Sequence, residues 1–495
     1  MKLFAALFFA TPLFAVAQPT DSLKQQYLAE LRTTGRTFTS WFYPNRDKLY
    51  ALPENTFVFK IDSSRQEFTA VLDKYTSRDK NADPAYIRSE QEGIHYFFDK
   101  FILDYPYFHE MQSGKKTSLS PAVQKRLDKN LADFNKPELL GNFDFKNYVD
   151  GFLHAKTNAE LKKAVYKTMD NQRLNSVLHV IPIYFTEPTC KSYWQYIYLL
   201  GHLDDWGVKN TDEAVQSFLA SCKDTSLTNK LNEMYSNAIK ERGDHLVKTY
   251  KKAGSFDLDI HLFLPDSGAG KRPVIVYFSG GSWTKGNPEW SFSSCRNYAK
   301  KGWVAAAVEY RLADRHGTTP FEAVMDARSA IRWLRQHAPE YNIDTSRIVA
   351  SGNSAGGHLV LATALADKWN ERTDDLRYSP SPNLLLINSG VYDLYGDGTP
   401  TWISKPLKDK NTVKEISPVH LIRKNLPPML LLHGTADNSV PYSTAVAFES
   451  EMKKAGNDYE FHTLEGAPHE IWFDRRFTST VTKLRSAFLK KYGYE

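Results

Sequence analysis

A serine suited to nucleophilic chemistry lies in the sequence Gly352-Asn353-Ser354-Ala355-Gly356. The apolar stretch Ile348-Val349-Ala350 precedes it, and a helical pattern that reaches Leu365 follows it. A glycine on each side of the serine suits a turn so sharp that side chains there would collide. The pattern predicts a strand, a sharp turn and a helix with Ser354 at the tip, which is the context of an acyl-transfer nucleophile. The alternative is a glycine-rich turn with a solvent-exposed serine.

Asp437 and His469 supply the two other groups that a serine nucleophile needs. Each follows a short apolar segment of strand type near the end of the chain. An imidazole can take the serine proton, and a buried carboxylate can hold that imidazole in the required tautomer. The chain order Ser354, Asp437, His469 predicts a Ser-His-Asp triad. Asp393 is the second candidate for the acid, and an Asx turn or a helix cap is the alternative role of Asp437.

Glycines also follow the apolar segment Val274–Phe278, in the sequence Ser279-Gly280-Gly281-Ser282. Glycine lets the backbone approach a substrate oxygen closely, and backbone N–H groups can then stabilise an oxyanion. The amide of Ala355 lies where a helix is expected to start, which also favours a developing oxyanion. Four tryptophans near the predicted loops are candidates for apolar walls, although each also suits simple packing: Trp283, Trp290, Trp402 and Trp472.

Residues 251–495 alternate apolar segments of strand type with helical patterns. This alternation is typical of an α/β fold with a mostly parallel sheet and helices on both faces. One of the helices is expected to start at Thr319-Pro320, a cap followed by a first-turn proline. The expected strands are 258–264, 274–278, 303–308, 347–351, 384–388, 429–433 and 459–464.

Residues 18–250 are expected to form a mostly α-helical domain, to which the sequence assigns no function. Ser120-Pro121 marks the start of one helix, and Gly243 marks the end of another. The piece Thr56–Lys60 is strand-like and could be an edge element. Asp204-Asp205 could be called a carboxylate pair, but an exposed loop is the expected setting.

Residues 1–17 have the features of a secretory signal peptide. Lys2 precedes the apolar run Leu3–Val16, and Ala15-Val16-Ala17 is a cleavage site of the A-x-A type. The run is too short to span a bilayer, and no second long apolar segment follows. We therefore expect an exported protein, periplasmic or secreted, cleaved near Ala17 and without a membrane span.

The 495 residues allow two domains, and the formal net charge of +6 is small against 63 basic and 57 acidic residues. No basic block is present, so a nucleic-acid partner is not expected. Three cysteines, Cys190, Cys222 and Cys295, leave at least one thiol unpaired within the chain, and Cys190 and Cys222 could form a disulfide. None of the three cysteines has the spacing of a metal site.

From about residue 256 to the end, the sequence resembles the serine hydrolases of the α/β-hydrolase fold, and within them the hormone-sensitive-lipase-like and acetyl-xylan-esterase-like carboxylesterases. Besides the Ser354 motif, the likeness lies in Glu309-Tyr310-Arg311-Leu312, in Asp326–Leu334 and in His433-Gly434-x-x-Asp437-x-x-Val440-Pro441. The resemblance implies that Ser354 attacks an ester carbonyl and that the amides of Gly281, Ser282 and Ala355 hold the oxyanion. It also implies that no metal or organic cofactor is required. One departure is that the family's oxyanion strand usually ends in His-Gly-Gly-Gly, whereas here Ser279 takes the place of the histidine.

The resemblance and the expected export together imply a small-molecule or carbohydrate ester as substrate, such as acetylated or feruloylated polysaccharide. The insertion Tyr395–Lys414 is expected to lie over the site. A prolyl-oligopeptidase-like serine peptidase is the second interpretation, although its β-propeller does not fit a helical first half. The third is a catalytically weak hydrolase-fold binding protein.

Overall fold

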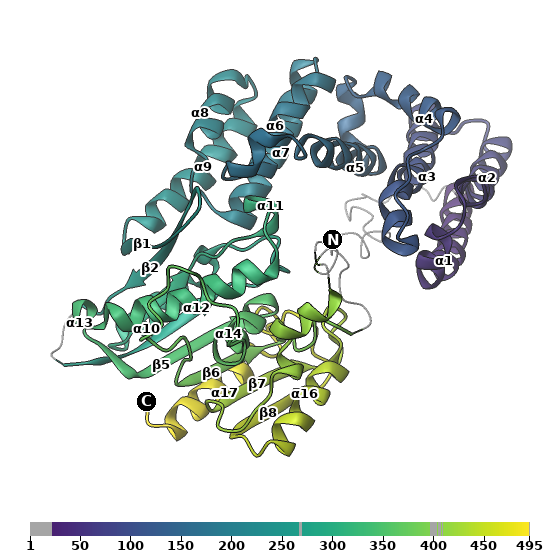
Figure 1. Cartoon of the computed structure of the whole chain (residues 1–495). Coiled ribbons are helices and arrows are strands. Elements are labelled where there is room, and N and C mark those ends of the chain that lie inside the picture. The colour runs from purple at the N-terminus through teal and green to yellow at the C-terminus, as the bar shows by residue number, and fades with distance from the viewer. Residues whose placement is uncertain (1–21, 267–269, 397–402, 404–406, 408, 495) are drawn as a thin grey trace. The chain divides into compact units, whose positions relative to one another are not determined.

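The computed structural model describes residues 22–266, 270–396, 403, 407 and 409–494 (Figure 1). The signal peptide expected at residues 1–17 and Trp402 lie outside the described residues. The chain forms two compact units, Met1–Ala155 and Lys156–Glu495. This division lies well before residue 250, where the sequence suggested a domain boundary.

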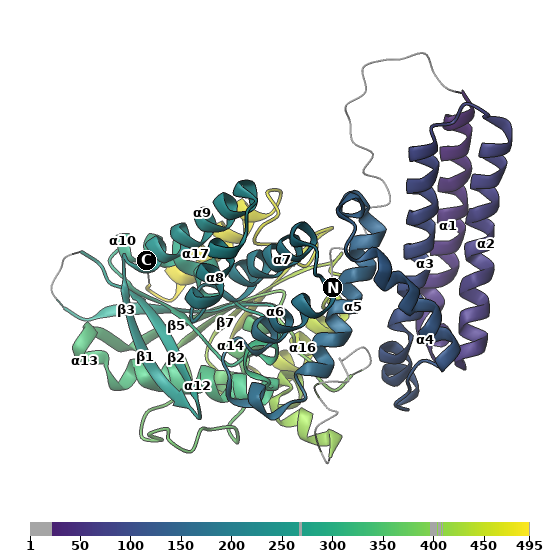
Figure 2. The ribbon, with the colours of Figure 1, turned by 90° about the horizontal axis from the view of Figure 1, so that it is seen from above.

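The first unit is built on three long helices that lie side by side (Figure 2): α1 (Ser22–Tyr50), α2 (Glu54–Arg78) and α3 (Pro84–Ser113). Aromatic rings fill the space between them, and Phe38 of α1 packs edge-on against Phe68 of α2 and Phe98 of α3. The elements that follow are α4 (Pro121–Asp128), the 3-10 helices η1 (Lys129–Asp133) and η2 (Pro137–Gly141), and α5 (Phe143–Glu160).

Thr56–Lys60, which the sequence suggested as a strand, lies inside α2. Phe57, Ile61, Phe68 and Leu72 are all buried on one side of this helix. Their helical spacing gives the segment an apolar face that packs against α1 and α3, and this packing outweighs the local β-propensity.

The second unit begins with a helical region: η3 (Ala164–Thr168), α6 (Gln172–Tyr184), α7 (Pro188–Trp206), α8 (Asp212–Ser221) and α9 (Thr225–Arg242). Ion pairs join this region to the short helix α11 (Ala313–His316) and to the sheet. Arg315 contacts Asp170 at 2.7 Å, and Lys209 contacts Asp259 at 2.6 Å and Glu309 at 2.8 Å. These contacts make the later helices part of the second unit. Within the described residues, no disulfide joins Cys190 in α7 to Cys222.

One sheet of eight strands, in the order β1-β2-β4-β3-β5-β6-β7-β8, forms the centre of the second unit. The β1–β2 and β2–β4 pairs are antiparallel, and the other pairs are parallel. Every strand expected from the sequence is present, whereas β1 was not foreseen because its lysines interrupt the apolar pattern. The strands are β1 (Leu246–Ala253), β2 (Phe256–Phe263), β3 (Arg272–Phe278), β4 (Val304–Val308), β5 (Ile343–Asn353), β6 (Leu384–Asn388), β7 (Met429–Gly434) and β8 (Tyr459–Leu464).

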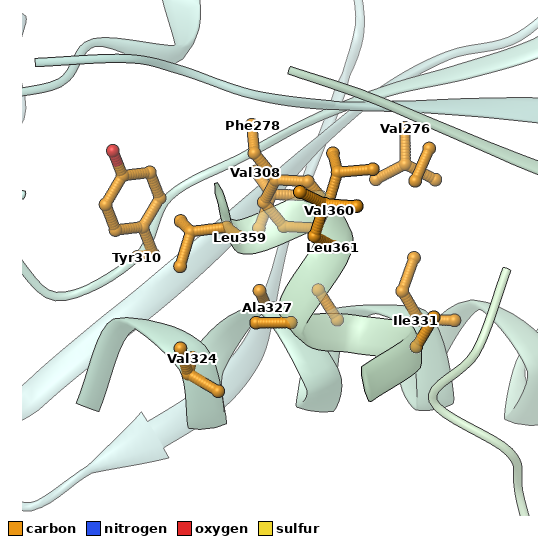
Figure 3. Close-up of a cluster of buried hydrophobic side chains, with 14 of the residues drawn as sticks. Val276, Phe278, Val308, Tyr310, Val324, Ala327, Ile331, Leu359, Val360 and Leu361 are labelled. Carbon is orange, nitrogen blue, oxygen red and sulfur yellow. The ribbon is translucent and has the colours of Figure 1, made fainter. Parts of the chain in front are cut away.

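Helices cover both faces of the sheet, as predicted. Side chains of alternating strand residues separate into two buried clusters, with Val276 and Phe278 in one and Ile275 and Tyr277 in the other. The first cluster includes α12 (Pro320–Gln336), α14 (Ala355–Leu365) and α16 (Tyr442–Lys454), and the second includes α10 (Phe292–Lys300) and α17 (Thr478–Lys491). Figure 3 shows side chains of α14 between the strands and α12.

Short helices complete the unit, and α12 begins at the Thr319-Pro320 cap that the sequence predicted, where Thr319 and Glu322 form a capping box. Within the described ranges, no helix is long and apolar enough to cross a membrane. The short helices are η4 (Pro288–Ser291), α11 (Ala313–His316), α13 (Ala338–Tyr341), η5 (Lys410–Ile416) and η6 (Pro418–His420).

Candidate active site

Ser354 stands at the junction of β5 and α14 with backbone angles φ 56° and ψ −123°. A left-handed φ is strained for any residue except glycine. The neighbours explain why the turn is possible: a Cβ on Gly352 would lie 2.3 Å from the carbonyl oxygen of Gly356, and one on Gly356 would lie 2.1 Å from that of Phe278. The strand, sharp turn and helix that the sequence predicted are therefore present, with the serine at the tip.

Asp437 and His469 form a hydrogen-bonded pair, with 2.7 Å between Asp437 Oδ2 and His469 Nδ1. The other carboxylate oxygen accepts the backbone N–H groups of Ser439 and Val440 at 2.8 and 2.9 Å. An ionised carboxylate only accepts hydrogen bonds, so the proton of the imidazole lies on Nδ1 and its Nε2 is left as a base.

Burial alone would raise the pKa of Asp437, but hydrogen bonds from His433, His469 and the Val440 N–H hold that pKa well below its usual range. His433 Nε2 lies 3.3 Å from Asp437 Oδ2 and 3.0 Å from the carbonyl oxygen of Val440. The carboxylate therefore stays charged at neutral pH. His433, which the sequence showed only as part of a motif, thus lies beside Asp437 and helps to keep this carboxylate charged.

The two loops that carry this pair also fix each other. Asp437 follows β7 and His469 follows β8, and the Ala436 N–H donates to the carbonyl oxygen of Ala467 at 3.1 Å. A Cβ on Gly434 would lie 2.2 Å from that same oxygen, so the loops are in close contact. Because β5, β6, β7 and β8 are parallel neighbours, Ser354, Asp437 and His469 all follow carboxyl ends at one edge of the sheet.

Asp393, the second candidate for the acid, has partners in its own loop. Its Oδ1 accepts hydrogen bonds from the Ser417 hydroxyl at 2.9 Å and from the Tyr395 N–H at 2.8 Å, and His420 lies 3.5 Å away. The hydrogen bond to His469 belongs to Asp437, which the sequence had ranked first.

The segment Ser279–Asn287, which we term the oxyanion loop, follows β3 and lies against the serine turn. A Cβ on Gly280 would be 3.4 Å from Ser354 Cβ. Gly281, Ser282 and Trp283 have φ values of 107°, 56° and 57°. The carbonyl oxygen of Gly281 accepts the N–H groups of Thr284 and Lys285, each at 3.1 Å.

In this tight turn, the N–H groups of Gly281 and Ser282 do not donate to acceptors within the loop. Within the described part of the chain, neither N–H has an acceptor. Together with Ala355 at the start of α14, they are the amides that the sequence proposed for the oxyanion hole. A Cβ on Gly281 would lie 2.2 Å from the carbonyl oxygen of Lys285, so only glycine fits there.

Tyr310 holds this loop through a hydrogen bond, a role that the sequence did not reveal. Its hydroxyl donates to the carbonyl oxygen of Ser279 at 2.7 Å. The Ser279 side chain, which replaces the histidine usual at this position, lies close to Gly286, where a Cβ would be only 2.7 Å from the hydroxyl oxygen. The only hint was the motif Glu309-Tyr310-Arg311-Leu312, whose contacts a sequence does not show.

The candidate tryptophans have different surroundings. Trp472 contacts the His469 ring, with 5.8 Å between centroids, and the buried Trp283 contacts the His358 ring at 5.1 Å. Trp290 is exposed and donates its indole N–H to the carbonyl oxygen of Asp204 at 3.1 Å. Among the residues that the structure describes, no group of three or more His, Cys, Asp or Glu side chains could hold a metal ion.

Comparisons with known proteins find esterases among the proteins that are similar to this chain. The BD-FAE family model matches residues 258–452. A probable isoprenylcysteine alpha-carbonyl methylesterase of Arabidopsis thaliana is 26% identical over 43% of this chain and 48% of its own length. The probable carboxylic ester hydrolase LipM of Mycobacterium tuberculosis is 30% identical over 37% of this chain and 46% of its own length.

The chain thus spans about half the length of these curated relatives. Among solved structures, a thermophilic esterase of Thermogutta terrifontis is 37% identical, with 51% of this chain and 94% of that chain covered and a TM-score of 0.47. The match to the family model lies within the second unit and begins in β2.

Proposed function

We propose that the second half of this chain, which is similar to carboxylesterases and has an α/β-hydrolase fold, hydrolyses carboxylic esters through an acyl-enzyme on Ser354. The observation that carries the proposal is the 2.7 Å hydrogen bond between Asp437 and His469, at the same sheet edge as the strained Ser354. A buried carboxylate–imidazole pair beside such a serine suits acyl transfer.

In the first step, Ser354 Oγ adds to the ester carbonyl carbon while its proton passes to Nε2 of His469. Asp437 stabilises the imidazolium that forms, and its lowered pKa keeps it charged for this purpose. The carbonyl oxygen becomes an oxyanion and accepts hydrogen bonds from the amides of Gly281, Ser282 and Ala355.

In the second step, the bond to the alcohol breaks and the imidazolium of His469 gives its proton to the leaving oxygen. Water then adds to the acyl-enzyme, with the same imidazole as its base, and the acid product leaves Ser354. These steps use only side chains and backbone amides of the chain.

We also propose that the substrate is a carbohydrate ester, acetylated or feruloylated, and that the protein acts after export. The signal-peptide pattern at residues 1–17 and the resemblance to acetyl-xylan-esterase-like enzymes support this. Acetylated xylan oligosaccharide and p-nitrophenyl acetate, compared by kcat/KM, test the substrate class. A kcat/KM on the oligosaccharide below that on p-nitrophenyl acetate would reject it.

The reaction class is tested with p-nitrophenyl acetate and an aminoacyl-proline anilide, using wild type and Ser354→Ala. We expect ester turnover that falls at least about 10⁴-fold in Ser354→Ala. Turnover of the anilide alone would favour the peptidase interpretation. No turnover, or turnover that Ser354→Ala leaves unchanged, would reject the ester proposal and favour a binding role.

A further inference from the structure

The C-terminal end of α7 contacts the oxyanion loop directly. The Trp206 indole N–H donates to the carbonyl oxygen of Thr284 at 3.1 Å, and the carbonyl oxygen of Asp205 accepts the Gly286 N–H at 3.1 Å. Lys285 Nζ lies 2.6 Å from the Asp205 carboxylate. Backbone and side chain of the same helix end therefore hold three successive residues of the loop.

The contact continues to the end of the loop. The buried Asn287 donates from Nδ2 to the carbonyl oxygen of Asp204 at 3.3 Å. Gly207, where α7 ends, has φ 79°, and a Cβ there would lie 3.0 Å from Asn287 Oδ1. The helix ends on a glycine at the place where it meets the loop.

The opposite side of the loop rests on α11. The Ala313 N–H donates to the carbonyl oxygen of Trp283 at 2.9 Å, and the Asp314 N–H donates to that of Thr284 at 3.2 Å. Arg173 of α6 in turn contacts Asp314 Oδ1 at 2.8 Å. The carbonyl of Thr284 thus accepts from two directions, from the Trp206 indole and from α11.

The residues held by α7 and α11 are hydrogen-bonded to the turn that carries the amides expected to bind the oxyanion. Thr284 and Lys285 are the residues whose N–H groups donate to Gly281, and the adjoining Gly280 lies against Ser354. If Thr284 shifts, the turn that aims the Gly281 and Ser282 amides shifts with it. A displacement of about 1 Å at such a site costs on the order of 10²-fold in rate.

We propose that Leu203–Trp206, at the end of α7, is a positioning element for the oxyanion hole, and that Trp206 is its main residue. The proposal rests on the esterase function proposed above for Ser354. The helix lies outside the matched residues 258–452, so a loop inside the matched region is positioned by a helix that precedes it.

The test compares Trp206→Phe with Trp369→Phe. Both tryptophans are half-buried and pack against the same apolar cluster, but the buried indole nitrogen of Trp369 has no hydrogen-bond partner among the described residues. Each substitution therefore removes a similar packing area, and only Trp206→Phe removes a hydrogen bond to the loop.

The first readout is the kinetics of p-nitrophenyl acetate hydrolysis. In Trp206→Phe we expect kcat to fall about tenfold with KM unchanged, because the oxyanion exists only after the serine has added. In Trp369→Phe we expect both values to stay near those of wild type. A loss of kcat in Trp206→Phe no larger than in Trp369→Phe overturns the proposal.

The second readout is the affinity of an aryl trifluoromethyl ketone. Ser354 Oγ adds to its carbonyl carbon, the proton goes to His469, and the oxygen becomes a stable oxyanion, so the affinity follows the hole itself. We expect affinity to fall by the same factor as kcat in Trp206→Phe. Weaker kcat with unchanged ketone affinity overturns the proposal, since the damage would then lie elsewhere.

The third readout, amide hydrogen exchange of residues 279–287, does not need catalysis. Faster exchange in Trp206→Phe than in Trp369→Phe supports the positioning role even if wild type proves inactive, in which case only the esterase proposal fails. Equal exchange in both variants overturns it. Melting temperatures of the two variants, measured in parallel, show whether either has lost its fold.

Discussion

The acid–base loops and the oxyanion loop lie at the same edge of one sheet but are held by different parts of the chain. Asp437 and His469 are fixed by their immediate neighbours, through the N–H groups of Ser439 and Val440 and the contact between the loops after β7 and β8. The oxyanion loop depends on α7, about 80 residues earlier in the chain. One half of the site is thus local in sequence, and the other is not.

This difference has a chemical consequence. The base and its carboxylate need one hydrogen bond in the right orientation, and a compact pair of loops can provide it. An oxyanion hole needs several backbone amides held at fixed positions, and backbone in a loop is fixed only by contacts from outside. We therefore expect substitutions in the two regions to differ in how far they lower kcat. They should also differ in whether they speed amide hydrogen exchange in the oxyanion loop.

The largest effect is expected from Asp437→Asn. The asparagine oxygen can still accept from Ser439 and Val440, but its NH₂ group faces His469 and forces the imidazole proton onto Nε2. With that tautomer the imidazole cannot take the serine proton, so kcat should fall about 10⁴-fold. Steady-state kinetics on p-nitrophenyl acetate measure this.

Asp393→Asn is the matched control, because the hydrogen-bond partners of Asp393 among the described residues are Ser417 and Tyr395, and His469 is not one of them. We expect it to keep kcat within about threefold of wild type, as for a change remote from the chemistry. A larger loss in Asp393→Asn than in Asp437→Asn would reverse the assignment of the acid.

Gly281→Ala should displace the amides of the oxyanion loop. Its Cβ would lie 2.2 Å from the carbonyl oxygen of Lys285, and its φ of 107° is unfavourable for alanine. The loop must move, and we expect kcat to fall about 10²-fold while the Asp437–His469 pair stays intact. Gly456→Ala, also at positive φ but in open space, controls for the backbone strain and should leave kcat unchanged.

Low pH should lower the free energy of unfolding through His358, whose ring contacts Trp283 of the oxyanion loop. Burial lowers the pKa of His358 to about 4, although its Nε2 donates to the carbonyl of Ile416 at 2.7 Å. Between an ordinary pKa of about 6.5 and this value, the unfolded chain binds a proton that the native state does not, so stability is lost as the pH falls.

From pH 8 to pH 5 this histidine alone should cost about 2 kcal/mol of unfolding free energy, a factor of about 30 in the folding equilibrium. Urea unfolding of wild type and His358→Gln at the two pH values measures it, because glutamine can donate to the same carbonyl without titrating. The contribution of His358 is refuted if both proteins lose the same free energy. Other buried histidines, such as His202 and His316, add to the loss in both.

The smallest effect is expected from Lys285→Met. The ion pair with Asp205 is partly exposed, with 44% of the lysine side chain accessible, and pairs of this kind contribute little. The backbone N–H of Lys285 still donates to Gly281, so kcat should change by less than about threefold, as in the remote surface variant Lys368→Met. A tenfold loss specific to Lys285→Met would mean that charge, and not the Trp206 indole, positions the loop.

Local patterns were enough to predict the α/β sheet and the strand–turn–helix around Ser354, and they also ranked Asp437 above Asp393. Each depends on residues close together in sequence: apolar periodicity, glycines that permit a turn, and polar residues after a strand. The pairing of Asp437 with His469 followed because parallel strands end at one edge.

Long-range packing was not predictable in this way. The strand β1 was missed because Lys248, Lys251 and Lys252 hide its pattern. Lys251 is buried with its charge paired to Asp326 at 2.6 Å and to Glu371 at 2.9 Å. The boundary near residue 250 was suggested by the change from helical patterns to alternating strands and helices. In the structure, the ion pair of Asp170 with Arg315 and that of Lys209 with Asp259 join the region of α6 to α9 to the rest of the second unit. The sequence around Asp205 did not indicate that the carbonyl and carboxylate of this residue contact the oxyanion loop.

The position of α7 also limits how this polypeptide can be shortened. A fragment beginning at β1 would retain the whole region matched by the family model, together with its carboxylate and imidazole, yet it would lack the indole and carbonyls that reach Thr284, Gly286 and Asn287. We therefore expect a fragment that starts near Lys156, and not one that starts at β1, to keep the contacts that hold the oxyanion loop.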